Sequence, residues 1–246
     1  MVILGLLVGG ILAGQSLIRA SELRSISSDF QRYQTSYYSF RNKYFALPGD
    51  MTNATSFWGI RTGSGSVTGS DVTCHATISV VTGTCNGNGD GRNFPITGDA
   101  SGGELYLPWQ HLSFGGMIEG SFTGASASTG SSVATAGTNT PLGRIGGTYF
   151  GITWFTGPMS GDTNYFDGSY NKNYATFNAT SGYPLKPEEA WNIDTKLDDG
   201  KPGTGAIMTM KNTSVFMPNC ADSNTAATAQ YSLSRTDKVC AVFRTL

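Results

Sequence analysis

An apolar stretch at the start of the chain passes without interruption into an amphipathic pattern. Residues 1–18 contain no charged side chain. Beyond them, apolar residues recur at alternating spacings of three and four, which is the repeat of one helix face. These residues are Leu23, Ile26, Phe30, Tyr33, Tyr37, Phe40 and Tyr44. No glycine or proline lies between Gln15 and Leu47, and Pro48 then stops the pattern. The pattern predicts one continuous helix about 70 Å long.

Residues 1–18 have three interpretations. A cleaved signal peptide has an apolar run of this length, but it also has a charged segment before the run. It has no reason to continue in phase into a second helical segment. A buried core helix is the second interpretation. The third is a transmembrane helix, which needs about 20 apolar residues, so its first residues would precede Met1. The unbroken helical pattern favours this third interpretation.

The rest of the chain is predicted to be rich in strands and loops. Strand-like runs bounded by turn residues occur at 148–155, 174–177, 206–210 and 239–245. A short helix is predicted from Glu104 to about Gly115, and another begins near Glu188. Residues 121–147 are almost entirely Ser, Thr, Gly, Ala and Asn, which predicts a long exposed loop or a linker inside the head. We therefore expect an α+β fold, with the apolar helix stripe packed on an antiparallel sheet.

Composition indicates an exported protein without a strong charge. Charged residues make up 13% of the chain, about half of the usual share, and there are 33 glycines. The formal net charge is −1. Nucleic-acid-binding proteins usually present a basic face, so no nucleic acid is expected as a partner.

Disulfides are the expected use of the cysteines, which are Cys74, Cys85, Cys220 and Cys240. None belongs to a C-x-x-C pair, and only His75 and His111 could complete a zinc site, which disfavours structural zinc. An even number of cysteines in a chain of this composition is typical of an oxidising compartment. Three pairings are possible. We predict 74–85 with 220–240, which closes two short loops.

Several motifs together indicate a family. The apolar start contains Ile3-Leu4-Gly5-Leu6-Leu7 and runs unbroken into the amphipathic helix, and in this it resembles the type IV pilin and type II secretion pseudopilin superfamily. Over nearly the whole chain, further motifs are similar to those of pilin-like proteins with enlarged heads: LPGDMTNATSFWG, NGNGDG, WQHLSFGGMIEG, IDTKLDDGKPGTG and KVCAVF. The family's basic leader, cleavage site and early glutamate are not in the chain. The resemblance implies roughly nine mature residues before Met1.

The resemblance implies a structural subunit of a type IV pilus-like or type II secretion filament. Residues 1–18 would form the transmembrane and filament-core half of the helix, residues 19–47 the half packed on the head, and residues 48–246 the disulfide-stapled head. Partners would be other subunits, and the inner membrane before assembly, with the head in the periplasm. The final location would be an extracellular filament or a periplasmic pseudopilus. Two pairs of small residues permit close helix approach: Gly5 with Gly9, and Gly10 with Gly14.

No residue is predicted to be catalytic. The chain has no G-x-S-x-G elbow and no H-E-x-x-H motif. His75 adjoins a predicted disulfide cysteine, and His111 lies near Trp109 on a predicted helix, so both are interpreted as structural. A membrane-tethered extracytoplasmic enzyme or a carbohydrate-binding module is the alternative function.

Calcium is the one cofactor that the chain suggests, and the first candidate is a glycine-rich loop. Asn86, Asn88 and Asp90 stand at alternate positions before Gly91, like the first half of a calcium loop. Thr97 occupies the position where a bidentate glutamate belongs. A plain Asn-Gly turn is the alternative interpretation.

The second calcium candidate is the carboxylate group formed by Asp194, Asp198 and Asp199. Its position resembles the metal-binding loop of some pseudopilin heads. Three carboxylates this close in sequence repel one another unless they are solvated or neutralised by a cation. Lys196 and Lys201 could provide that neutralisation without a metal.

Overall fold

The chain folds into a long N-terminal helix and a head built on one antiparallel sheet. The computed structural model describes residues 2–61, 74, 82–94, 103–126, 133–155, 171–209, 220–223 and 225–246, with the side chains of residues 2–8 outside the described part. Within these residues the fold is α+β, as predicted, with four strands in one sheet.

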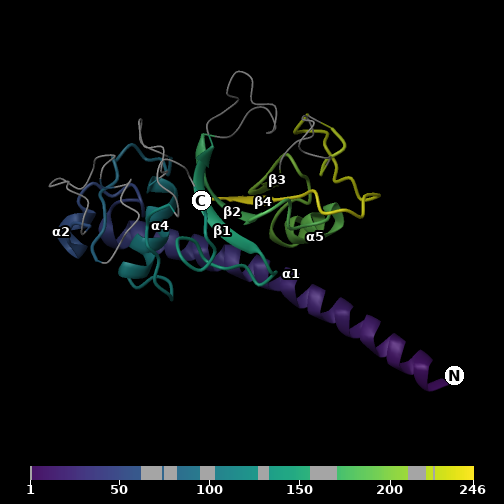
Figure 1. Ribbon diagram of the computed structural model, residues 1–246. Coiled ribbons are helices and arrows are strands. Elements are labelled where there is room, and N and C mark those ends of the chain that lie inside the picture. The colour runs from purple at the N-terminus through teal and green to yellow at the C-terminus, as the bar shows by residue number, and fades with distance from the viewer. Residues whose placement is uncertain are drawn as a thin grey trace.

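Helix α1 runs from Val2 to Tyr44 without a break, as its sequence pattern predicts. Figure 1 shows its N-terminal part extending away from the head and its C-terminal part passing along the strands toward α4. The helix ends at Phe45, whose φ of +54° is left-handed and uncommon for a residue with a side chain. Pro48, which follows shortly after, cannot continue a helix.

The sheet has the strand order β1-β2-β4-β3, and every neighbouring pair is antiparallel. Its strands are β1 (Thr148–Phe155), β2 (Lys172–Ala179), β3 (Ile207–Thr209) and β4 (Val242–Thr245). All four were predicted, although β2 is longer and β3 and β4 are shorter than expected. The last strand of the chain therefore lies inside the sheet, between β2 and β3, and ties its two halves together.

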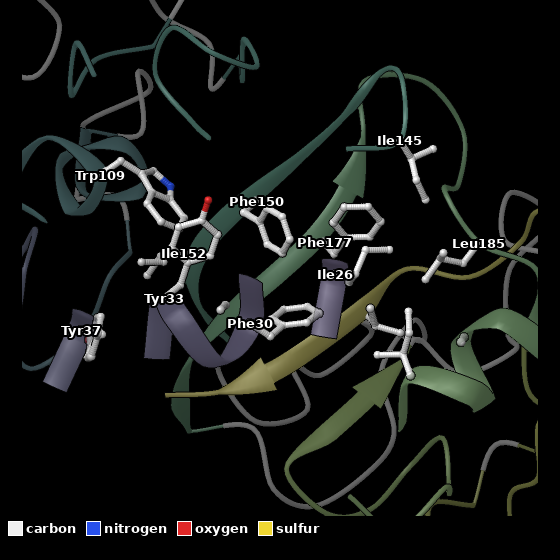
Figure 2. Close-up of a cluster of buried hydrophobic side chains, with 14 of the residues drawn as sticks. Ile26, Phe30, Tyr33, Tyr37, Trp109, Ile145, Phe150, Ile152, Phe177 and Leu185 are labelled. Atoms are coloured by element: carbon white, nitrogen blue, oxygen red, sulfur yellow. The ribbon is translucent and has the colours of Figure 1, made fainter. Parts of the chain in front are cut away.

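The main core lies between α1 and the sheet. The stripe residues Ile26, Phe30, Tyr33, Tyr37 and Phe40 are all buried, and Leu23 and Tyr44 pack partly buried against the same cluster. Figure 2 shows the stripe side chains directed toward those of the strands. The 3.6-residue repeat of the sequence pattern thus correctly predicted which face of α1 is covered.

Aromatic contacts hold α1 to both the sheet and helix α4 (Gly103–Phe114). The ring of Phe30 lies edge-on to Phe150 of β1, with centroids 5.4 Å apart. Tyr33 contacts the same Phe150 at 5.0 Å and Trp109 of α4 at 4.9 Å (Figure 2). Burying an aromatic side chain of this kind stabilises a fold by roughly 1.5–3 kcal/mol. These three elements therefore form one packed unit.

The opposite face of the sheet has a smaller core of its own. Tyr174 of β2, Met208 of β3 and Phe243 of β4 pack there with three alanines, Ala221, Ala229 and Ala241. Ala221 and Ala229 belong to the segment between the last two cysteines, so this segment covers the sheet on the side away from α1.

Both disulfides have the predicted pairing. Cys74 is bonded to Cys85, and Cys220 is bonded to Cys240. The second bond ties the covering segment to the residues just before β4. The described part of the chain has no cysteine outside these two bonds.

The segment after α1 contains a short helix, α2 (Ala54–Trp58), which the sequence analysis did not predict. The described parts of residues 121–147 include buried positions where we expected an exposed loop. Asn139 is 1% exposed there, and its side-chain amide donates to the carbonyl oxygens of Ala125 and Val133, each at 2.9 Å. Polar side chains of this segment therefore form hydrogen bonds with its backbone, which a helix or strand would otherwise provide.

Candidate functional site

The first candidate site is the exposed apolar part of α1. Four aliphatic side chains are largely in solvent: Ile11 (58% exposed), Leu12 (60%), Leu17 (71%) and Ile18 (63%). An added Cβ at Gly9, Gly10 or Gly14 would meet no described atom within 4 Å outside the backbone of the helix itself, so another helix could approach closely there. Gly5, the fourth glycine of the predicted pairs, lies outside the described side chains.

An ion pair marks the point where α1 leaves the head. Arg19 contacts Glu189 through two hydrogen bonds, Nε to Oε1 at 2.5 Å and Nη2 to Oε2 at 2.7 Å. Glu189 lies on helix α5 (Pro187–Leu197). Burial raises the pKa of Glu189, but the bonds from Arg19, the backbone N–H of Lys186 and the charges of both residues together hold it below its usual value. The charged pair fixes the helix to the head just before the buried stripe begins.

In the described part of the chain, no helix is both long enough and apolar enough to cross a membrane. The predicted transmembrane half, residues 1–18, falls partly outside that description because the side chains of residues 1–8 are not included.

The second candidate site is the carboxylate group after α5. Asp194, Asp198 and Asp199 each place one carboxylate oxygen within 4.8 Å of the others. Oxygens held around one calcium ion at 2.3–2.6 Å lie at separations of this size. The three carboxylates therefore fit a hard cation, and the structure brings together the set predicted from the sequence.

Donors of the protein already bind these carboxylates. Buried Asp194 accepts hydrogen bonds from the Tyr231 hydroxyl (2.8 Å) and from the backbone N–H of Gly200 (3.2 Å). Burial raises the pKa of Asp194 to about 7. Asp198 accepts the backbone N–H groups of Ala206 and Ile207. The group thus fastens the turn between α5 and β3 whether or not a cation joins it.

The third candidate site, the loop 86–91, is wrapped around an aspartate that the sequence analysis did not single out. Asp50 accepts backbone N–H groups from Gly89 (2.7 Å), Asp90 (3.0 Å) and Gly91 (2.9 Å). Gly89 and Gly91 have φ values of +77° and +83°, a conformation that glycine adopts easily. Burial raises the pKa of Asp50 to about 6, although these N–H groups act in the opposite direction.

The three residues predicted as calcium ligands in this loop already accept hydrogen bonds from the protein, and those of Asn88 and Asp90 are local. Asn86 Oδ1 accepts the backbone N–H of Thr55, at the start of α2. Asn88 Oδ1 accepts the N–H of Asp90, and Asp90 Oδ1 accepts that of Arg92. This is the hydrogen bonding of Asx turns, which agrees with the alternative interpretation of this motif.

A buried glutamate stands beside the same loop. Glu104, near the start of α4, is fully buried and accepts the N–H of Asn88 at 2.9 Å through Oε1. Its other oxygen, Oε2, has no hydrogen-bond partner in the described residues. Burial raises the pKa of Glu104 to about 8, with the nearby charges of Asp50 and Asp90 acting in the same direction. At neutral pH this side chain is therefore largely protonated.

No protein-family model, curated protein or solved structure matches this chain.

His111 is built into the core. Its Nδ1 accepts the backbone N–H of Gly49 at 3.0 Å, and Nε2 lies 3.0 Å from the Thr84 hydroxyl and 3.3 Å from the carbonyl oxygen of Cys85. Because the carbonyl can only accept, Nε2 carries the proton of a neutral ring. The histidine thus joins the turn after α1 to the loop at Cys85. His75 lies outside the described residues.

Asp50 and Glu104 could not have been recognised from local sequence. Asp50 follows a Pro-Gly pair and Glu104 begins a helix, and both are ordinary positions for acidic residues. Their partners lie 16 to 41 residues away along the chain. The glycine-rich loop was the one available signal, because a loop with this many glycines can present several N–H groups to one anion.

Proposed function

We propose that this chain is a structural subunit of a filament of the type IV pilin or pseudopilin kind, assembled through α1. The observation that carries the proposal is the division of this one helix. Its stripe side chains from Ile26 to Phe40 are buried in the head, whereas its aliphatic residues from Ile11 to Ile18 stand in solvent.

Exposed aliphatic side chains on a projecting helix favour association. Removing apolar surface from water is worth about 25 cal/mol per Å². The N-terminal part of α1 projects from the head (Figure 1), and Ile11, Leu12 and Leu17 are each more than half exposed. Copies of the same helix offer a matching apolar surface, and the small residues Gly10 and Gly14 allow close approach. A bundle of such helices, with heads outside, is the assembly that these features support.

The remainder of the head suits a scaffold outside the cytoplasm. Two disulfides are typical of an oxidising compartment. As part of the proposal, the subunits gather at the inner membrane before assembly, with their heads in the periplasm.

The alternative function, a tethered enzyme, would use carboxyl groups with raised pKa values in a cavity. Asp50 lines a cavity of about 360 Å³ together with Arg41. Its carboxylate, however, accepts three backbone N–H groups from the loop wrapped around it. This arrangement supports a role in holding the loop more than a role as a general base.

Sedimentation of the full chain and of matched variants tests the proposal. We expect the full chain to form large assemblies in plain buffer and a chain starting at Arg19 to stay monomeric. Leu12→Arg should dissolve the assemblies because it places a charge in the helix bundle. Leu142→Arg is the control, since Leu142 is equally exposed (63%) but lies on the head.

Electron microscopy of the sedimented material should show filaments with the wild type and with Leu142→Arg. A full chain that sediments as a monomer in plain buffer would contradict the proposal. An equal effect of the two arginine substitutions would also contradict it. Such assemblies would be nonspecific aggregates that do not depend on packing of the N-terminal helices.

A further inference from the structure

Charged residues are divided unevenly between helix α1 and helix α5. Helix α1 carries five basic residues and two acidic ones, whereas residues 187–199, which form α5 and the start of its turn, carry five acidic residues and one basic one. The two helices already meet in the same chain through the ion pair of Arg19 with Glu189 (Figure 1). Each helix also exposes a charge that this pair does not use.

On α1 that charge is Arg24. It follows Arg19 by five residues, which turns it about 140° around the helix axis and moves it about 7.5 Å along the axis. Its side chain is exposed and forms no ion pair with the described residues. Because Arg19 faces α5 of its own head, Arg24 points away from that α5 and toward any copy of the chain that packs on its side of the helix.

On α5 the unused charge is Glu188. Its side chain is exposed, and it has no ion pair or hydrogen bond within the part of the chain that the structure describes. Trp191, which is 38% exposed, follows one helical turn later, so the carboxylate and the indole are neighbours on the surface of α5. These two groups suit an arginine side chain, since its guanidinium forms charged hydrogen bonds with carboxylates and stacks on aromatic rings.

We propose that Arg24 of one copy binds Glu188 and Trp191 of the next copy in the filament. The inference rests on the proposed assembly through α1. Glu188 adjoins Glu189, which lies at the level of Arg19 along the helix axis. A parallel copy displaced by five residues, or about 7.5 Å, therefore brings its Arg24 to the level of Glu188.

The glycines of α1 fit the same displacement. Five residues of displacement place Gly14 of one helix level with Gly9 of the other, and an added Cβ at either position would meet no described atom within 4 Å outside the backbone of its own helix. Gly10 precedes Arg24 by 14 residues, which places the two within about 40° of each other around the helix. Gly14 lies about 40° to the other side of Gly10. The helix contact and the Arg24 contact therefore belong to one interface.

The proposed contact joins two different surfaces of the same chain. Arg24 lies on one side of α1, and the receiving surface of α5 lies on the other. Contacts of this kind between identical copies can repeat without limit, whereas a two-fold contact between the same surfaces closes as a dimer. The arrangement thus supports growth of a filament.

Sedimentation of charge-reversed full-length chains tests the inference. Arg24→Glu and Glu188→Arg should each raise the lowest protein concentration at which assemblies sediment by about tenfold, because like charges then face each other. An equal mixture of the two variants should restore the wild-type concentration, since each variant then meets the opposite charge on the other. Mixing would not restore a contact formed within one chain.

Lys238→Glu is the matched control, because it makes the same change of charge at an exposed position of the head outside α1 and α5. It should sediment like the wild type. A wild type that stays monomeric would contradict the filament and this contact together. Assembly of the wild type and of Arg24→Glu at the same concentration would overturn only this contact, as would a mixture that assembles no better than the single variants.

Discussion

Two buried carboxyl groups near the loop 86–91 show how burial, hydrogen bonds and nearby charges together set the protonation state of a side chain. Asp50 receives three backbone N–H groups, and its pKa rises only to about 6. Glu104 receives the N–H of Asn88, and its pKa rises to about 8. Burial is the largest cause in both cases, and Glu104 is the more completely buried of the two. The charges of Asp50 and Asp90 raise the pKa of Glu104 further, whereas the three donors at Asp50 favour its ionised form.

The raised pKa of Glu104 predicts that the protein loses stability as pH increases. The folded state keeps a proton that the unfolded chain, with a pKa near 4.5, has already released. The contribution is fully present below about pH 4.5 and is lost as pH rises to about 8, by at most about 1.4 kcal/mol per pH unit. The raised pKa values of Asp50 (about 6) and Asp194 (about 7) also reduce stability as pH increases, over lower pH ranges. Urea unfolding at several pH values measures the slope.

Glu104→Gln resembles the protonated side chain and does not titrate. We expect its free energy of unfolding to change less between pH 5 and 8 than that of the wild type. Parallel profiles for the two proteins would contradict the assignment of the raised pKa to this glutamate.

At the scale of elements, the turn between α5 and β3 is the place where a cation would act. We predict that millimolar calcium raises the melting temperature of the full chain in detergent relative to chelator, because a ligand bound only to the folded state stabilises it. Asp199→Asn should remove this response. Asp199 is exposed and binds the Lys201 N–H and the Thr204 hydroxyl, so its replacement leaves the buried Asp194 in place.

Asp90→Asn serves as the control, because Asp90 belongs to the loop around Asp50 instead. Calcium should raise the melting temperature of this variant as much as that of the wild type. Identical melting in calcium and in chelator would leave both loops as turns closed by protein hydrogen bonds alone.

The elements that could be predicted from the sequence are those with a periodic hydrophobic pattern or with signals from residues that are close in sequence. The stripe from Ile26 to Phe40 is periodic, and the first part of β1 alternates between buried and partly buried positions, so both could be predicted. The buried loop around Asn139 could not be predicted, because a polar composition by itself indicates an exposed loop. Here the Asn139 amide donates hydrogen bonds to backbone carbonyl groups that would otherwise need partners in a helix, a strand or water. Of the candidate sites, the group at Asp194 was predictable from sequence proximity. The wrapping of the loop 86–91 around Asp50 was not predictable, since the N–H groups that bind Asp50 follow it by 39 or more residues in the chain.

At the scale of the whole molecule, the bond between Cys220 and Cys240 joins the covering segment to β4. Replacing both cysteines by alanine should lower the free energy of unfolding by about 3 kcal/mol, because the bond restricts a loop of 20 residues in the unfolded chain. Urea unfolding of the oxidised protein measures the loss. Non-reducing peptide mapping is the control, and recovery of a 74–220 crosslink would contradict the pairing.

The contact between α1 and the head has a mechanical consequence. The buried stripe spans the helix from Ile26 to Phe40, and the Arg19–Glu189 pair secures its near end. A pull on the N-terminus along the helix axis therefore loads all of these contacts together, in shear. Detachment would require them to break at once, whereas a sideways pull would peel them one after another. The head is thus attached most firmly against tension directed along the helix.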